Sequence, residues 1–480
     1  MSVEYDLVVI GGGSAGLVAA SAGAQINAKV ALIEKHLLGG DCLHYGCVPS
    51  KSLIHAAQIA YNVKTASRFG IYPNGTATNE PTIKLDEAMG HVKSVVDTIQ
   101  VHDSAERFEK LGVEVIFGAG QFVDEKTFEV NGRQLKARAF LIATGSRPAP
   151  PPVEGLKEAG FLTNEQVFSV KDRPDALAVI GAGPIGCELG QSFSRLGSDV
   201  TLLASRDVIM PKEEPEAAAV VQRLMEEEGV RILNNTRAKK VTVVDGKKHI
   251  FTGSETIVVD EILIATGRTP NVESLNLEAA GVTYDKKGVK VDAKLRTSNK
   301  RIYAAGDVIG GYQFTHVAGY EAGVAMQNAL IMPTKKADYR VIPWATFTDP
   351  ELARVGLTEK QARDRYGDDV FILRQDFSGV DRALAESAGY GFAKFITTGK
   401  GEILGAHIVG PHAGELIHEA VIAMSQKLKV SALQCIHVYP TLSEISPKTA
   451  LQLTKQKYAK NTFLQNFLRK FFNWRRSIAG

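Results

Sequence analysis

The sequence predicts an α/β fold of two related domains, followed by a third domain of the α+β class. Three observations support this. A short apolar strand leads into a glycine-rich turn and a helix-prone stretch twice, the segment LIATG also occurs twice, and after about residue 337 the pattern changes to short alternating strands. A chain of 480 residues is too long for one ordinary domain core, so several domains are expected.

The composition is typical of a soluble globular protein, with 44% hydrophobic residues, 23% charged residues and a net charge of +3. This balance argues against a nucleic-acid-binding protein, and no apolar run is long enough to span a bilayer. Four cysteines do not make a disulfide-stapled secreted scaffold. The N-terminal segment runs straight into a strand without a signal peptide pattern, so a cytoplasmic location is expected.

The first glycine turn follows the strand Tyr5–Ile10 and contains Gly11, Gly13 and Gly16. The spacing G-x-G-x-x-G lets backbone N–H groups approach a pyrophosphate at a helix N-terminus. Glu34 ends the next strand, 18 residues after Gly16, where a carboxylate can accept hydrogen bonds from ribose hydroxyls. A plain glycine turn is the alternative, but the combination favours a Rossmann-like dinucleotide-binding domain.

The second glycine turn repeats the spacing at Gly181, Gly183 and Gly186. Ala204 stands where Glu34 stands in the first unit, and Ser205 and Arg206 follow it. A hydroxyl and a guanidinium suit a 2′-phosphate better than a bare diol, which favours NADPH over NADH. The alternative is that Arg206 is an ordinary surface arginine. Two dinucleotides on one chain indicate one flavin and one nicotinamide.

The repeated segments LIATGSRP and LIATGRTP close the two units. We expect a discontinuous FAD-binding domain at 1–150 and 268–337, and an NAD(P)-binding domain at 151–267. An insertion in the first domain carries two cysteines and two helical stretches, at about 49–67 and 85–111. The third domain, at 338–460, should contain a helix at 415–427 and strands at 341–347, 370–377, 391–397 and 403–409.

Cys42 and Cys47 lie in the segment GGDCLHYGCVPSK, beside paired glycines and at the start of a helix. Their spacing does not fit a C-x-x-C metal knuckle. A helix N-terminus and the nearby Lys51 both lower the pKa of a thiol, which favours the thiolate needed for disulfide exchange. The pattern therefore predicts a redox-active pair.

This segment resembles the redox-disulfide signature of the class I pyridine nucleotide-disulfide oxidoreductases, which include dihydrolipoamide dehydrogenase, glutathione reductase and mercuric reductase. GAGPIGCELG at 181–190 and RIYAAGDV at 301–308 extend the similarity to about residue 455. The resemblance implies FAD and NAD(P)H as cofactors and a homodimer formed through the C-terminal domain. It also implies that each active site is completed by the partner subunit.

The resemblance also implies residue roles. Cys47 would be the flavin-proximal thiolate that forms a charge-transfer complex, and Cys42 would be the interchange thiol. Lys51 would lie near flavin N5 and pair with Glu188, although both could also be ordinary surface charges. Asp307 would bind the ribityl chain, and Thr315–Ala318 would follow the isoalloxazine edge. The other cofactor-binding positions expected are Gly40, Thr144, Gly145, Gly267 and Ala318.

The chain departs from the family pattern where a catalytic histidine, backed by a glutamate, is expected. Tyr439 takes the place of the histidine, while Glu444 is kept. Tyrosine is a poor base at neutral pH but can donate a hydrogen bond or steer a bound metal. His437 would lie on the same strand face as Tyr439 in a regular strand and could substitute, although a structural role is favoured.

Mercuric reductases also carry a tyrosine at this place, but their C-terminal cysteine pair and N-terminal heavy-metal domain are absent from this chain. The expected electron acceptor is therefore a small-molecule or protein disulfide, or a thiol-bound metal ion, with no resident metal site. Cys187 and Cys435 have no partner spacing and are both expected to be buried.

Residues 461–480 form a basic, aromatic tail in which Phe463, Phe467 and Phe471 recur every four residues. The pattern predicts an amphipathic helix. Packing against the dimer is the favoured interpretation, and peripheral contact with the inner face of a membrane is the alternative. The second interpretation would make the protein an electron-donating subunit of a membrane-associated redox system.

Overall fold

A computed structural model describes residues 3–72 and 80–479. The other residues, which are 1–2 and 73–79 of the predicted 1–150 domain and 480 of the 461–480 tail, lie outside the described part. Contacts divide the chain into two compact units. The first unit comprises Met1–Asp207 and Gly229–Asp338, and the second comprises Val208–Glu228 and Tyr339–Gly480. The sequence did not indicate that residues 208–228 join the C-terminal unit.

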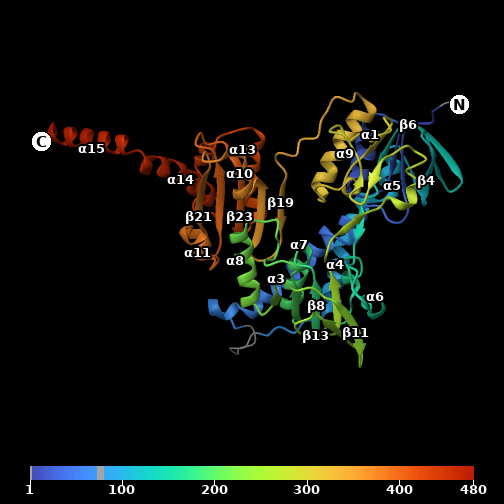
Figure 1. The fold of residues 1–480 in the computed structure, drawn as a ribbon, viewed down its shortest axis with the longest axis horizontal. Coiled ribbons are helices and arrows are strands. Elements are labelled where there is room, and N and C mark those ends of the chain that lie inside the picture. Colours follow the sequence, from blue (N-terminus) through green and yellow to red (C-terminus); the bar gives the residue numbers. More distant parts are fainter. Residues whose placement is uncertain (1–2, 73–79, 480) are drawn as a thin grey trace. The chain divides into compact units, whose positions relative to one another are not determined.

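The first unit contains a parallel sheet in the order β3-β2-β1-β6 (Figure 1). β18 pairs in parallel with the last residues of β6. The strands are β1 (Tyr5–Ile10), β2 (Val30–Glu34), β3 (Val113–Phe117), β6 (Arg133–Ile142) and β18 (Ile302–Ala304). β2, β18 and the last residues of β1 and β6 are almost continuously apolar because both faces of the sheet are buried there. Helices α1 (Ser14–Gln25) and α9 (Thr315–Leu330) pack on one face, and β4 (Gly120–Asp124) and β5 (Thr127–Val130) extend β6 as an antiparallel hairpin.

A second parallel sheet in the same unit repeats this order as β10-β9-β8-β14, beside the antiparallel meander β11-β12-β13. Its strands are β8 (Ala176–Ile180), β9 (Asp199–Leu203), β10 (Arg231–Leu233) and β14 (Glu261–Ile264), and the meander strands are β11 (Lys240–Val244), β12 (Lys247–Phe251) and β13 (Thr256–Val259). The ends of the two repeated segments, β7 (Ser146–Pro148) and β15 (Arg268–Pro270), pair with each other. The internal repeat in the sequence is thus a repeat of structure.

The insertion between β2 and β3 is helical, as predicted. Its helices are α2 (Gly40–His44), α3 (Cys47–Lys64), α4 (Leu85–Gln100) and α5 (Ala105–Lys110). The stretch predicted as one helix at 85–111 is interrupted after Gln100. Ser104 begins α5 as its N-cap, because its hydroxyl accepts a hydrogen bond from the backbone N–H of Arg107 at 3.3 Å.

The second unit contains an antiparallel sheet in the order β19-β20-β23-β22-β21. Its strands are β19 (Pro343–Thr346), β20 (Glu351–Gly356), β21 (Phe371–Asp376), β22 (Phe392–Thr397) and β23 (Ile403–Gly410), and its helices include α8 (Pro215–Glu227), α12 (Ala413–Leu416), α13 (His418–Ser425) and α14 (Ile445–Lys460). The sequence did not predict β20, whose Arg354 is a charged residue in a buried position. The predicted fold class is confirmed.

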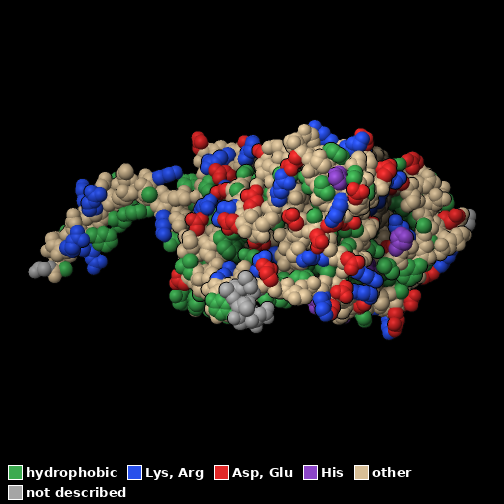
Figure 2. Space-filling model, turned by 90° about the horizontal axis from the view of Figure 1, so that it is seen from below, with side chains coloured by type: hydrophobic (Ala, Val, Ile, Leu, Met, Phe, Trp, Pro, Cys, Tyr) green, Lys and Arg blue, Asp and Glu red, His purple; other side chains and the backbone are tan. Residues whose placement is uncertain are grey.

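The chain ends in α15 (Thr462–Ser477), which follows α14 after a break at Asn461. Within the described residues, no helix combines the length and the apolar character needed to cross a bilayer. Over the face drawn in Figure 2, acidic and basic side chains are interspersed, in agreement with the nearly balanced composition.

Candidate active site

The two cysteines of the predicted redox pair lie at a junction between two helices. Cys42 is in α2, and Cys47 is the first residue of α3, directly after the N-cap Gly46. Asp41, in the first turn of α2, connects this junction to distant segments of the chain. Its carboxylate is 3.1 Å from the guanidinium of Arg268 and accepts a hydrogen bond from Asn164 at 3.2 Å. These contacts hold both cysteines in a defined position.

The structure describes both cysteines as free thiols, and a hydrogen bond from Cys42 to Cys47 joins them. This bond lowers the pKa of Cys47 to about 6, against the cost of burial, and Thr315 and Lys51 contribute in the same direction. The hydroxyl of Thr315 lies 3.4 Å from the Cys47 sulfur. The pKa of Cys42 is raised, first by the same hydrogen bond and then by burial. The negative charge of the reduced pair therefore resides on Cys47.

Lys51 lies one turn into α3 and forms an ion pair with Glu188, with 2.9 Å between Nζ and Oε2. Glu188 is buried on α7 (Pro184–Arg195), the helix that follows the second glycine turn. A surface position for Glu188 is therefore excluded. The pair joins the cysteine helix to the second nucleotide-binding motif, 137 residues away in sequence.

The residues around the first glycine turn fit a dinucleotide such as FAD. A Cβ at Gly16 would lie 1.8 Å from the carbonyl oxygen of Gly11, so only glycine allows this close contact between helix and turn. A Cβ at Gly13 would meet only the Cα of Gly40, at 3.9 Å, which leaves room for a pyrophosphate beside the start of α1. Glu34 accepts a hydrogen bond from the N–H of Gly12 at 2.7 Å, so its carboxylate is held beside this turn.

Further residues of the first unit suit the sugar chain of a flavin. Asp307 is largely buried, and desolvation raises the pKa of its carboxyl despite a 2.6 Å hydrogen bond from Ser146. Arg268 also approaches it, at 3.6 Å. Thr144 and Gly145 precede this cluster on the loop after β6, and Gly145 has open space around its Cα. Ala318 lies in the first turn of α9, which begins at Thr315 beside Cys47.

The second glycine turn has the same geometry. A Cβ at Gly186 would lie 1.9 Å from the carbonyl oxygen of Gly181, and Gly183 and Gly267 have open space around them. Ala204 is buried after β9, whereas Ser205 and Arg206 are exposed. A carboxylate is absent from this position, so the site can accept either a hydroxyl or a phosphate on the ribose.

The structure changes the interpretation of the tyrosine segment in the second unit. Residues 435–441 form no regular strand, so the prediction that His437 and Tyr439 share a strand face is wrong. The exposed Tyr439 donates a hydrogen bond to Asp381 at 3.0 Å, which raises the pKa of its hydroxyl. One carboxylate oxygen of Glu444 is buried without a hydrogen-bond partner in the described part of the chain. Tyr439 and Glu444 therefore share no hydrogen bond within the single chain.

His437 has a carboxylate partner instead. Its Nε2 lies 3.2 Å from Glu419, and its Nδ1 lies 2.8 Å from the carbonyl oxygen of Cys435. Cys435 itself is exposed in the single chain, in a segment without regular secondary structure, so the prediction that it is buried is wrong. The other lone cysteine, Cys187, is fully buried, as predicted.

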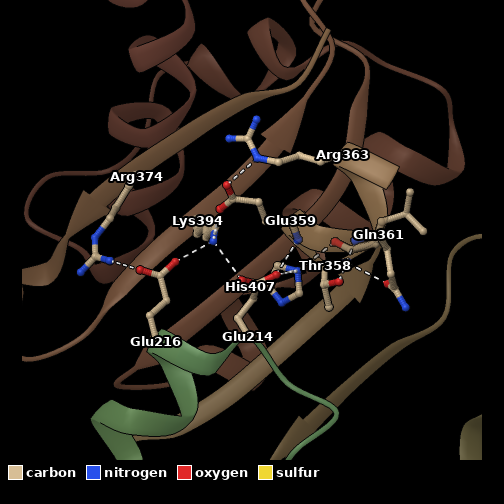
Figure 3. A network of polar contacts seen from close by, with 10 residues as sticks. Glu214, Glu216, Thr358, Glu359, Gln361, Arg363, Arg374, Lys394 and His407 are labelled. Atoms are coloured by element: carbon tan, nitrogen blue, oxygen red, sulfur yellow. Dashed lines mark hydrogen bonds and ion pairs between the residues drawn. The ribbon is translucent and has the colours of Figure 1, made fainter. Parts of the chain in front are cut away.

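A second lysine–glutamate cluster lies in the other unit (Figure 3). Lys394 on β22 contacts Glu214, Glu216 and Glu359 at 2.9, 2.6 and 2.7 Å. These three carboxylates lie close enough together to bind a cation, and the ammonium group of Lys394 already lies among them. The cluster is therefore an ion-pair network that attaches the start of α8 to the sheet, and not a metal site.

The sequence did not predict several residues that hold Asp307 or the helix junction of the two cysteines in place. These residues are Asp41, Ser146, Asn164 and Arg268. Ser146 and Arg268 do carry a signal, since each lies one residue after the glycine of a repeated ATG segment. Asn164 carries none, because its hydrogen bonds to Asp41 and to the carbonyl oxygen of Tyr45 depend on a contact between segments more than 100 residues apart.

Comparisons with known proteins agree with this geometry. A family model for pyridine nucleotide-disulphide oxidoreductases matches residues 5–322, and the model of the corresponding dimerisation domain matches residues 342–450. Mercuric reductase from Staphylococcus aureus is 36% identical over 468 residues, which cover 94% of this chain and 83% of that protein. Dihydrolipoyl dehydrogenase from Thermus scotoductus is 38% identical over 470 residues, which cover 94% of this chain and 98% of that protein.

A solved structure is also similar along nearly the whole chain. The Cu(II) complex of the HOCl-induced flavoprotein disulfide reductase RclA from Escherichia coli superimposes with a TM-score of 0.84 at 27% sequence identity. The match covers 94% of this chain and 99% of that one.

Proposed function

Because this chain belongs to the pyridine nucleotide-disulphide oxidoreductase family, we propose that its Cys42–Cys47 pair passes electrons to a disulfide or to a thiol-bound soft metal ion. The enzyme is FAD-dependent and takes its electrons from NAD(P)H. The observation that carries the residue assignment is the hydrogen bond from Cys42 to Cys47, which concentrates the negative charge on one of the two sulfurs.

FAD, which the first glycine turn with Glu34 and Asp307 would hold, would supply two-electron transfer from the nicotinamide to the Cys42–Cys47 disulfide. Cys47 then stays a thiolate near neutral pH because Cys42, Thr315 and Lys51 all lower its pKa. Glu188 holds Lys51 in place, so Lys51 is a positioning residue for the charge on Cys47.

With a disulfide acceptor, Cys42 transfers its proton to the Cys47 thiolate, which already accepts its hydrogen bond, and attacks one sulfur of the acceptor. A mixed disulfide forms and the first acceptor thiolate leaves. Cys47 releases the proton and attacks the sulfur of Cys42, which restores the Cys42–Cys47 disulfide and frees the second thiolate. The net reaction consumes NAD(P)H, one proton and the disulfide, and it yields NAD(P)⁺ and two thiols.

With a divalent soft metal ion, the two cysteine thiolates bind the ion, and two electrons reduce it to the neutral metal. NAD(P)H is oxidised to NAD(P)⁺ and one proton is released. No proton has to be delivered to the product, so this reaction does not require the histidine that Tyr439 replaces. The mercuric reductase relatives make this acceptor class a candidate for the present chain.

The test is NADPH oxidation by the FAD-loaded enzyme with lipoamide, oxidised glutathione or a thiol-bound Hg(II) complex as acceptor. We expect Cys42→Ser and Cys47→Ser to lose on the order of 1000-fold or more in turnover, because neither can re-form the disulfide. Cys435→Ser is the matched control, since Cys435 is an exposed cysteine outside the pair. Full activity of Cys42→Ser with all three acceptors would exclude the proposed role of the pair.

We also propose NADPH as the preferred donor, supported by the exposed Ser205 and Arg206 in place of an acidic residue after β9. Arg206→Ala should raise the KM for NADPH about tenfold and leave the KM for NADH nearly unchanged, because only NADPH carries the 2′-phosphate. Arg223→Ala, on an exposed face of α8, is the matched control. Equal effects on both coenzymes would contradict the preference.

The match to the dimerisation domain supports a homodimer, with the exposed segment around Tyr439 as part of its interface. Ile436 and Val438 are apolar and almost entirely exposed in the single chain, which a subunit contact would explain. Ile436→Asp should give monomers at micromolar concentration in sedimentation velocity, while Leu428→Asp, at an exposed position after α13, serves as a comparison. A dimer that is unchanged by Ile436→Asp would exclude this segment from the interface.

The acid that protonates a thiol product is either Tyr439 or His437. The His437–Glu419 pair supports His437, because the carboxylate fixes the orientation of the imidazole ring, as a proton donor requires. The pH profiles of kcat for His437→Gln and Tyr439→Phe would distinguish them, and the variant that removes the acidic or basic limb identifies the group.

The alternative function as a membrane-associated electron donor is supported by the tail alone and predicts that activity requires membranes and residues 461–480.

A further inference from the structure

Helix α15 separates apolar and polar side chains around its axis. At about 100° per residue, its large apolar side chains fall on one half of the helix. The other half carries glutamine, asparagine, serine and three of the four basic side chains, whereas Arg475 falls within the apolar half near the C-terminal end. The apolar residues define the aromatic face of α15: Phe463, Leu464, Phe467, Leu468, Phe471, Phe472 and Trp474. No residue of α15 is buried, and Phe463 and Trp474 are 81% and 58% exposed.

The chain itself covers little of the aromatic face. Asn461 ends α14 and caps α15 by accepting a hydrogen bond from the N–H of Leu464 at 2.9 Å. Gln465 then donates to the carbonyl oxygens of Tyr458 and Ala459, which attaches the first turn of α15 to the end of α14. Beyond this turn the aromatic rings contact mainly one another, with Phe471 near Phe467, Phe472 and Trp474.

The charge of the C-terminal segment differs from that of the whole chain. Lysines and arginines nearly balance the acidic residues overall, at 56 to 53. From Ile445 to the C-terminus the sequence contains eight lysines and arginines and no aspartate or glutamate. In Figure 2 the projecting helix shows green and blue side chains and no red ones. An anionic surface matches this charge, whereas a second copy of the same helix would bring like charges together.

We propose that α15 docks the enzyme on the surface of an anionic lipid bilayer, with its axis in the plane of the membrane and its aromatic face among the acyl chains. The aromatic side chains supply apolar area at the interface, and Arg469, Lys470, Arg475 and Arg476 attract anionic headgroups. Asn461 separates this helix from the folded unit, so docking needs no rearrangement of the sheet. The proposal does not depend on the identity of the electron acceptor.

Flotation of the FAD-loaded, full-length enzyme with vesicles tests this proposal. The enzyme should float with phosphatidylcholine vesicles that contain phosphatidylglycerol and much less with phosphatidylcholine alone. Arg469→Ser combined with Lys470→Ser should lower the partition coefficient about 30-fold at low salt. Phe467→Ser combined with Trp474→Ser should lower it on the order of 100-fold. Asn466→Ser combined with Asn473→Ser, on the polar half of α15, should bind like the unchanged enzyme.

Oxidation of NADPH with a soluble acceptor should be the same in all three double variants, which shows that they fold and bind FAD. The proposal is overturned if the unchanged enzyme does not float with anionic vesicles, or if the aromatic variant floats as well as the asparagine control. Sedimentation velocity without lipid tests whether a second copy of the chain packs on the aromatic face instead of a membrane. If the aromatic variant turns dimers into monomers and vesicle binding is absent, α15 packs against a second copy instead.

Discussion

Lys51 and Lys394 each join segments that are far apart in sequence, but their surroundings differ. Lys51 contacts one glutamate, lies beside the redox cysteines and has 36% of its side chain exposed. Lys394 lies among three glutamates and is only 3% exposed. The first lysine is partly accessible to solvent, and the second is enclosed.

The difference shows what each arrangement can do. In the first pair water reaches the lysine and screens its charge, although Glu188 is buried, and this charge still lowers the pKa of the neighbouring Cys47 thiol. An enclosed lysine among three carboxylates cannot act on a substrate. Its loss would leave buried negative charges without compensation, so the network chiefly holds α8 on the sheet of the second unit.

The largest expected effect tests the enclosed cluster. Lys394→Met should lower the free energy of unfolding of the second unit by about 3–5 kcal/mol, because Glu214 stays buried without its partner. Urea unfolding followed by circular dichroism measures the change. Lys360→Met, which breaks only the exposed pair with Asp364, should cost less than about 0.5 kcal/mol. Equal costs for both variants would mean that enclosure does not matter here.

The next effect concerns His407, which lies in the same cluster. Burial, with Arg354 nearby, lowers the pKa of His407 to about 3. The unfolded chain therefore binds a proton near pH 6.5 that the folded chain does not bind, and stability falls as the pH drops below 6.5. From pH 6.5 to 5 the loss should be about 1.6 kcal/mol.

His407→Asn should remove this contribution to the pH dependence of the free energy of unfolding, even if it also changes stability at pH 7. Unfolding midpoints in urea at several pH values measure the slope. His55→Asn, at an exposed position on α3, is the control and should keep the slope of the unchanged protein. An unchanged slope in His407→Asn would show that His407 is not the group responsible.

A smaller effect is expected at the redox pair. Lys51→Met should raise the pKa of Cys47 from about 6 by roughly one unit, since the positive charge favours the thiolate. The rate of alkylation of the reduced enzyme by iodoacetamide, followed against pH, reports this pKa. Lys64→Met, at the end of α3, should leave the titration unchanged. If the pKa of Cys47 did not change, the hydrogen bonds from Cys42 and Thr315 alone would explain why it is low.

The smallest effect completes the comparison of the two lysines. Lys51→Met should lower the free energy of unfolding by about 1–2 kcal/mol, less than Lys394→Met, because only the buried Glu188 loses a partner and Lys51 itself is partly exposed. The same variant should nevertheless slow thiol–disulfide exchange at pH 6. Urea unfolding and NADPH oxidation on the same preparation would show the two responses. A stability loss as large as that of Lys394→Met would place both lysines in the same structural class.

The sequence predicted the strand–turn–helix units and the cysteine pair because their signals lie within about 20 residues of one another. Gly11 and Gly181 each follow an apolar strand, and the spacing to the next glycines requires close packing of helix on turn. Strand β20 was missed because Arg354 breaks its apolar pattern. The burial of that arginine depends on Glu213 and on the ring of Trp344, which other segments supply.

The sequence by itself determined the family, the fold class, the two glycine turns and the candidate redox pair, because periodicity and motif spacing are local properties. The tertiary structure decided which groups meet at the sulfur atoms and which charges are enclosed. Thr315 reaches Cys47 across 268 residues, Tyr439 turns to Asp381 and not to Glu444, and Glu214 joins Lys394 across 180 residues. Charge and burial at such contacts depend on segments brought together only by folding, so no local pattern encodes them.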